Sequence, residues 1–130
     1  MLLFGHRFLQ SECFYHISSI DAVINTPPSS TLYLEFDEKN LDIITYVREN
    51  GIKLSLSVKN ITELIYASSL GAKYIIIQKE LALSAQNIAE TYLFDAKILV
   101  SVENDNQIEE LANIGIDGLI YPNAIVKINS

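Results

Sequence analysis

The sequence predicts an α/β fold: a parallel sheet of five or six β-α units, curled into a partial (half) barrel with its helices mainly on one face. Two observations carry this prediction. Short apolar runs follow turn residues at a regular spacing, and the segments between them have the apolar periodicity of helices. The runs are STLYLEF from Ser30, GIKLSLS from Gly51, GAKYIII from Gly71, DAKILVS from Asp95 and GIDGLIY from Gly115. Connections of this length require parallel strands.

The first 30 residues are predicted to be an irregular segment with a short strand and a turn. We expect residues 13–17 to form the strand. Ser18 or Ser19 is expected to cap a helical turn over residues 20–24, which Pro27 and Pro28 then end. The β-α repeats follow over residues 31–128, and nothing in the composition divides the chain, so we expect one domain, 1–130.

Four helices are predicted between the strands, because apolar residues recur there at helical spacing. Their ranges are 40–50, 60–70, 80–94 and 105–114. Polar residues before each helix are expected to accept bonds from its free N–H groups, and glycines after it are expected to take a left-handed conformation. The expected N-caps are Asn40, Asn60 and Asn104 or Asp105, and the expected helix ends are Gly51, Gly71, Gly115 and, as a substitute, Asp95.

Alternation within the strands favours a curled sheet over a flat one. Leu32 and Leu34 share a face opposite Tyr33 and Glu35, and residues 53–58 alternate in the same way. A sheet with helices on both faces has strands that are apolar throughout, whereas a sheet with helices on one face has a mixed inner face. A flavodoxin-like three-layer sandwich remains the alternative, because residues 74–77 are apolar on both sides.

Composition excludes several classes of function. The net charge of −7 and the pI of about 4.7 disfavour nucleic-acid binding, and the nine basic residues form no cluster. No apolar stretch is long enough for a membrane span. One cysteine, Cys13, makes no internal disulfide, so we expect a reducing, cytoplasmic location.

A complete barrel of this type needs about 200–250 residues, so we expect a homodimer to cover the open edges and inner face.

The repeat resembles the small (βα) barrels of the class I aldolase and phosphate-binding type, through GAKYIII and GIDGLIYP. The resemblance is architectural and matches no functional family. Those aldolases form a Schiff base on a strand lysine, whereas the strand before Tyr121 and Pro122 has none. Lys97 lies at a strand start, and Lys79 is followed by Glu80, which is typical of a solvated lysine.

A second pattern is similar to glycerophosphodiester phosphodiesterases, which carry a His-Arg-Gly motif and later a Glu-x-Asp pair that binds a divalent metal. Here Gly5, His6 and Arg7 precede Glu35, Phe36 and Asp37. Phe8 replaces the glycine of that motif, and no histidine follows His16 to serve as the second catalytic imidazole. His16 itself lies in the run Phe14-Tyr15-His16-Ile17, and we expect it to pack against the fold.

Ligands bind at the carboxyl ends of parallel strands, so the polar residues there are the candidate site. The candidate catalytic residues are Glu35, Asp37, Glu103 and Lys79, of which the first three are also candidate ligands for a divalent metal. We predict no cofactor beyond that possible metal. The preferred interpretation is a non-catalytic module that self-associates or binds a small ligand or protein. The alternative is a metal-dependent or acid/base enzyme, lyase or phosphoester hydrolase-like.

Overall fold

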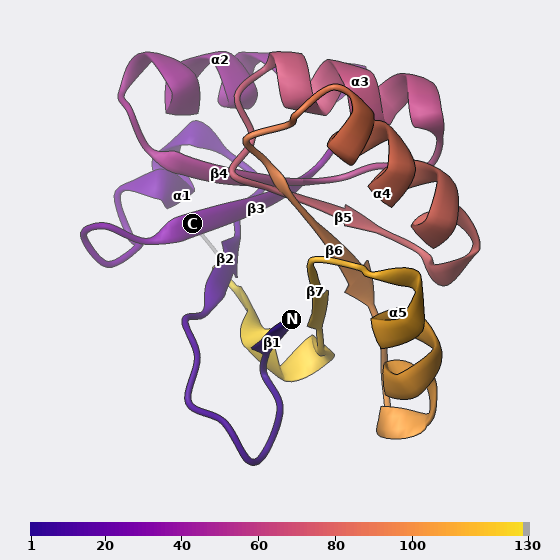
Figure 1. Cartoon of the computed structure of the whole chain (residues 1–130). Helices are drawn as coiled ribbons and strands as arrows, with labels where there is room; N and C mark the ends of the chain where they lie inside the picture. The colour runs from indigo at the N-terminus through magenta and orange to yellow at the C-terminus, as the bar shows by residue number, and fades with distance from the viewer. Residues whose placement is uncertain (129–130) are drawn as a thin grey trace.

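The computed structural model describes residues 1–128, so the last two residues of the expected domain lie outside the described part. It contains an open, curled sheet of eight parallel strands in the order β1-β7-β6-β5-β4-β3-β2-β8 (Figure 1). The strands are β1 (Leu2–Phe4), β2 (Phe14–His16), β3 (Thr31–Glu35), β4 (Lys53–Ser57), β5 (Tyr74–Ile77), β6 (Lys97–Ser101), β7 (Gly118–Ile120) and β8 (Ile125–Lys127). The predicted half barrel is confirmed, with more strands than expected.

The five α-helices lie where the spacing of apolar residues predicts them. They are α1 (Ile20–Val23), α2 (Leu41–Glu49), α3 (Ile61–Ser69), α4 (Ala82–Thr91) and α5 (Ile108–Ile114). Short 3-10 turns precede three of them: η1 (Glu38–Asn40), η2 (Lys79–Leu81) and η3 (Asp105–Gln107). A fourth, η4 (Pro122–Ala124), joins β7 to β8. None of the helices within residues 1–128 has the length and apolarity needed to cross a bilayer.

The helix ends confirm most of the expected caps and correct two. Asn60 accepts a hydrogen bond from Glu63 N–H at 2.9 Å, and Ser19 caps α1. Asn40 makes no capping bond; the capping carboxylate is that of Asp37, which starts η1 one turn earlier. At the end of α4 the left-handed residue is Leu93 (φ 53°), not Asp95. The helix ends at Thr91, so the turn that follows it comes two residues before Asp95.

All five helices pack on the same face of the sheet, which rules out the three-layer sandwich. A single cluster joins their apolar residues to the outward side chains of the strands, such as Leu34, Leu56 and Ile75. The predicted alternation is thereby confirmed. Figure 1 shows α2 to α5 following the outside of the curl, while the indigo β1–β2 segment and the yellow C-terminal segment lie away from α2 and α3.

A second apolar cluster fills the inner face of the curl. Phe4, Phe14 and Tyr74 meet there with ring centroids 5.1 to 5.4 Å apart. Ile76, Leu99, Ile120 and Ala124 complete the cluster, to which no α-helix contributes. Glu12 closes the amino-terminal end of this interior, accepting hydrogen bonds from Thr31 Oγ1 (2.9 Å) and Tyr74 OH (3.0 Å). The inner face is therefore filled by the chain itself.

Candidate functional site

The four sequence-predicted site residues do not share one cavity. Glu35 and Asp37 leave the end of β3 into two separate hollows, and Glu103 lines others beyond β6. Lys79 Nζ forms an ion pair with Glu110 Oε2 of α5 at 3.0 Å. Within residues 1–128, no three His, Cys, Asp or Glu side chains are grouped closely enough to hold a metal ion. These residues thus lie on the expected rim but are spread along it.

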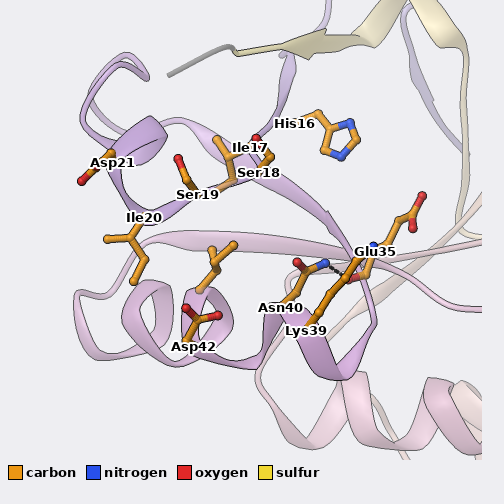
Figure 2. A pocket seen from close by; sticks show the side chains of 11 residues that line it. His16, Ile17, Ser18, Ser19, Ile20, Asp21, Glu35, Lys39, Asn40 and Asp42 are labelled. Atoms are coloured by element: carbon orange, nitrogen blue, oxygen red, sulfur yellow. Dashed lines mark hydrogen bonds between the residues drawn. The ribbon is translucent and has the colours of Figure 1, made fainter.

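A hollow lies at the carboxyl ends of β2 and β3, and we call it the rim pocket. It has a volume of about 720 Å³. Figure 2 shows its two walls, the segment from Ile17 to Asp21 on one side and the start of α2 on the other, with His16 and Glu35 at one end. Its lining is His16, Ile17, Ser18, Ser19, Ile20, Asp21, Glu35, Lys39, Asn40, Asp42 and Ile43.

The sheet register brings His16 and Glu35 together. His16 ends β2 and pairs with Tyr33 on β3. Glu35 lies two residues beyond Tyr33, so its side chain leaves the same inner face of the sheet. Asn40 fixes the other wall, because its Nδ2 donates to the Glu35 backbone oxygen at 2.9 Å (Figure 2). This bond holds η1 and the start of α2 over the end of β3.

His16 is a half-buried imidazole with an edge-on contact to Tyr33, ring centroids 4.9 Å apart. Burial lowers the pKa of His16 below its ordinary value of 6.5, the positive charge of Lys127 lowers it further, and Glu35 opposes both. The ring is therefore neutral at pH 7, with one nitrogen that donates and one that accepts. Within residues 1–128 no hydrogen bond occupies either nitrogen.

Burial also raises the pKa of Tyr33, opposed by a hydrogen bond with Ser57 and assisted by the charge of Glu35. The phenol next to His16 is therefore protonated at neutral pH. Tyr33 does not line the rim pocket itself, but its uncharged ring supports the neutral imidazole of His16 beside Glu35. The His16 imidazole can therefore hydrogen-bond a ligand without the desolvation cost of a buried charge.

The rim pocket carries more acceptors than donors. Asp21, Glu35 and Asp42 bring three carboxylates against the single ammonium group of Lys39. The side-chain N–H of Asn40 donates to the Glu35 backbone oxygen, and the side-chain oxygen of Asn40 can accept a hydrogen bond from a ligand. Asp21 points away from the other labelled side chains in Figure 2, and Glu35 lies at the end of the pocket next to His16. This arrangement suits a ligand rich in N–H or O–H donors and disfavours an anion.

A second polar group, the edge cluster, ties β1 to the rest of the sheet. It consists of His6, Arg7, Asp105 and Tyr121. Asp105 Oδ1 accepts hydrogen bonds from Tyr121 OH (2.9 Å) and His6 Nε2 (3.1 Å), and Arg7 Nη1 lies 3.6 Å from Asp105 Oδ2. The bonds from Tyr121 and His6 lower the pKa of Asp105 below 3.8, and burial together with Asp105 raises the pKa of Tyr121 to about 12.

The edge cluster has no ring nitrogen left for proton transfer. Phe8 N–H donates to His6 Nδ1 at 3.2 Å, so this nitrogen is unprotonated and Nε2 carries the proton that faces Asp105. Both nitrogens of the buried ring are engaged by the protein itself. The structure also keeps His6 out of the hollows that contain Glu35 and Asp37. We therefore assign the edge cluster a structural role.

No protein-family model and no curated protein match this chain.

Sequence reasoning missed the part that His16 and Asn40 play in the rim pocket. His16 was expected only to pack against the fold, although the short strand predicted over residues 13–17 already placed it near a carboxyl end. Asn40 was interpreted as a helix cap, because asparagine before a helix usually has that function. The alternation of Phe14, Tyr15 and His16 was the available signal: Phe14 and His16 share a face, and Phe14 faces the interior.

Proposed function

We propose that this protein is a non-catalytic ligand-binding module whose rim pocket takes a small polar molecule rich in hydrogen-bond donors. The observation that carries the proposal is the pocket of about 720 Å³ at the carboxyl ends of β2 and β3. Ligands of parallel α/β proteins bind at these ends of the strands. His16, Asn40 and Glu35 supply acceptors there, and Ile17, Ile20 and Ile43 supply apolar contact.

The charge balance of the pocket narrows the ligand class. Three carboxylates and one lysine repel a phosphate group, and no lining histidine is charged at neutral pH to offset them. We therefore do not propose phosphate binding, although the fold resembles that of phosphate-binding barrels. A polyol, sugar-like or amine-bearing molecule satisfies the acceptors, and its carbon skeleton can lie against the isoleucines.

Thermal unfolding with a panel of probes tests the proposal. A ligand present at 100 times its Kd stabilises the folded state by about 2.7 kcal/mol, which raises the melting temperature by several degrees. We expect monosaccharides, polyols or small amines to do so, and inorganic phosphate to have no such effect. Glu35→Gln, which should weaken binding about tenfold, should reduce the shift by about half, whereas Glu90→Gln, an exposed carboxylate on α4, should keep it. Stabilisation by phosphate alone, or equal shifts in both variants, contradicts the proposal.

Self-association is the second part of the proposal. Strands β1 and β8 are each paired on one side only, so both present a free edge. Large apolar side chains are exposed on or next to these edges, among them Leu2 on β1, Phe8 in the following loop and Val126 on β8. Because the inner face is already filled, we propose that a second copy covers the edges rather than the interior.

We also propose a cytoplasmic location. The single cysteine, Cys13, is an exposed free thiol, and free thiols are typical of a reducing compartment.

Sedimentation velocity tests the dimer. We expect a dimer at micromolar concentration that Phe8→Glu dissociates, because a charge there opposes burial of the edge. Leu83→Glu, a similarly exposed position on α4, should leave the dimer intact. A stable monomer of the unchanged chain at micromolar concentration would remove this part of the proposal.

A further inference from the structure

A second hollow opens at the carboxyl ends of β3 and β4, with a volume of about 630 Å³. We call it the aromatic pocket, because the rings of Phe36 and Tyr66 line it together with the side chains of Asp37, Glu38, Lys59 and Glu63. It is distinct from the rim pocket and shares no lining residue with it. We propose that the aromatic pocket binds a small organic cation, an alkylammonium or quaternary ammonium ion.

The two rings form one aromatic wall. Phe36 follows β3 and Tyr66 lies on α3, with ring centroids 6.0 Å apart and planes inclined by 32°. Phe36 is held in place because one side of it packs against the main core. Tyr66 remains 53% exposed, so one part of its ring is open to the pocket. Aromatic faces carry the negative part of the ring quadrupole and attract a cation positioned over them.

The charge of the pocket has the matching sign. Asp37, Glu38 and Glu63 bring three carboxylates against the one ammonium group of Lys59. Two of these carboxylates are already held by the backbone: Asp37 Oδ1 accepts from Lys39 N–H at 3.0 Å, and Glu63 Oε1 accepts from Lys59 N–H at 2.9 Å. Each keeps a second oxygen for a ligand. Because these side chains are already held in place, binding of a cation costs little side-chain conformational entropy.

An anion has less to bind in the same pocket, although α3 begins there. Asn60 Oδ1 takes the N–H of Glu63, and the Glu63 side chain takes the N–H of Lys59. These two donors at the start of the helix are therefore satisfied by the protein. Lys59 alone faces three carboxylates. The aromatic wall, the hollow beside it and the sign of the charge together specify an ammonium group attached to carbon, rather than a bare metal ion.

Choline and its neutral isostere 3,3-dimethylbutan-1-ol test the proposal in an amide chemical-shift titration of the whole chain at low salt. We expect choline to shift the amides of residues 36–38 and 59–66 in a saturable way, and the isostere to bind about tenfold more weakly. Tyr66→Leu should weaken choline binding about threefold or more, and Glu38→Gln should also weaken it. Tyr92→Leu and Glu90→Gln, which alter exposed residues outside the pocket, should not.

Four outcomes overturn the proposal. The isostere binds as well as choline, which makes the site merely apolar. Acetate shifts the same amides more strongly than choline, which makes it an anion site. Choline shifts residues elsewhere on the chain, or gives no saturable change at these amides up to about 50 mM. Both tyrosines and both glutamates are solvent-exposed, so their variants should fold and leave the comparison intact.

Discussion

The ring of Phe4 on β1 lies edge-on against the ring of Phe14 on β2, with centroids 5.1 Å apart, although β7, β6, β5, β4 and β3 separate the two strands in the sheet. A flat sheet would hold these rings far apart, since neighbouring strands lie about 4.8 Å from each other. The contact between the two rings therefore shows that the sheet is strongly curled. Aromatic side chains here fill the kind of interior that a larger barrel fills with layers of aliphatic ones.

Phe14→Ala should destabilise the protein by about 3–5 kcal/mol, because the side chain is fully buried at the centre of the inner cluster. Urea unfolding at pH 7 measures the loss. Tyr92→Ala removes an aromatic ring from a side chain that is 70% exposed and should cost less than about 1 kcal/mol. Equal costs for the two substitutions would show that the interior is not packed as described.

Gly118→Ala should also destabilise strongly, by about 1–3 kcal/mol or more. An added Cβ at this position on β7 would lie 2.8 Å from the Leu2 backbone oxygen and 2.8 Å from Leu99 Cδ2. The change should therefore loosen β1, which amide hydrogen exchange at residues 2–4 would reveal. Gly51→Ala is the matched control: it meets no atom within 4 Å, so its cost of about 1 kcal/mol comes from the positive φ alone. Fast exchange at β1 in both variants would contradict this explanation.

Stability should fall at high pH, in part through Tyr74. Burial, the hydrogen bond to Glu12 and the charge of Glu12 raise the pKa of Tyr74 from 10.0 to about 12. The folded state thus holds this proton more tightly than the unfolded state, and the resulting stability is present below about pH 10 and lost between about pH 10 and 12. Tyr74→Phe should reduce that alkaline loss, while costing about 1 kcal/mol at pH 8.

Urea unfolding at pH 8 and pH 11 measures the effect of Tyr74. Tyr92→Phe, at a 70% exposed position, serves as the control and should show the alkaline loss of the unchanged protein. If the phenylalanine variant at position 74 loses as much stability as the control does, the buried hydrogen bond to Glu12 does not persist in solution.

The pKa of His16 should lie below 6.5 and respond to its two charged neighbours in opposite directions. Removal of the positive charge in Lys127→Ala should raise the pKa, and removal of the negative charge in Glu35→Gln should lower it further. A titration of the imidazole by NMR measures all three values. A pKa that neither substitution moves would mean that His16, Glu35 and Lys127 do not share the rim in solution.

The repeat predicts most of the fold because each unit carries its own local signals. Turn residues such as Gly71 and Gly115 end helices, and the alternation in residues 31–35 indicates which face meets the helices. The edge strands escaped prediction for a physical reason. Leu2–Phe4 and Ile125–Lys127 are three residues long, and within residues 1–128 no α-helix adjoins them, so they are too short to show a periodic pattern. Their pairing with β7 and β2 is decided by long-range contacts.

The candidate site was predicted at the correct level of the sheet but not at the correct residues. Parallel topology places every carboxyl end on one rim, so Glu35 could be identified. Which residues join it depends on where the loops fold back. Asn40 reaches the Glu35 backbone only because η1 turns the chain before α2. Lys79 and Glu103 lie on the same rim in a hollow of their own, two and three strands away from β3.

The most direct measurement of the proposed function is an amide chemical-shift screen of small polar fragments against the unchanged chain and Glu35→Gln. Donor-rich neutral and amine fragments should shift the amides of residues 16–21 and 39–43, and Glu35→Gln should weaken them by about tenfold, as expected for loss of a charged hydrogen bond. Anionic fragments should leave these amides unmoved. If anionic fragments bind there preferentially, or all fragments gather elsewhere on the surface, the rim pocket is not the ligand site.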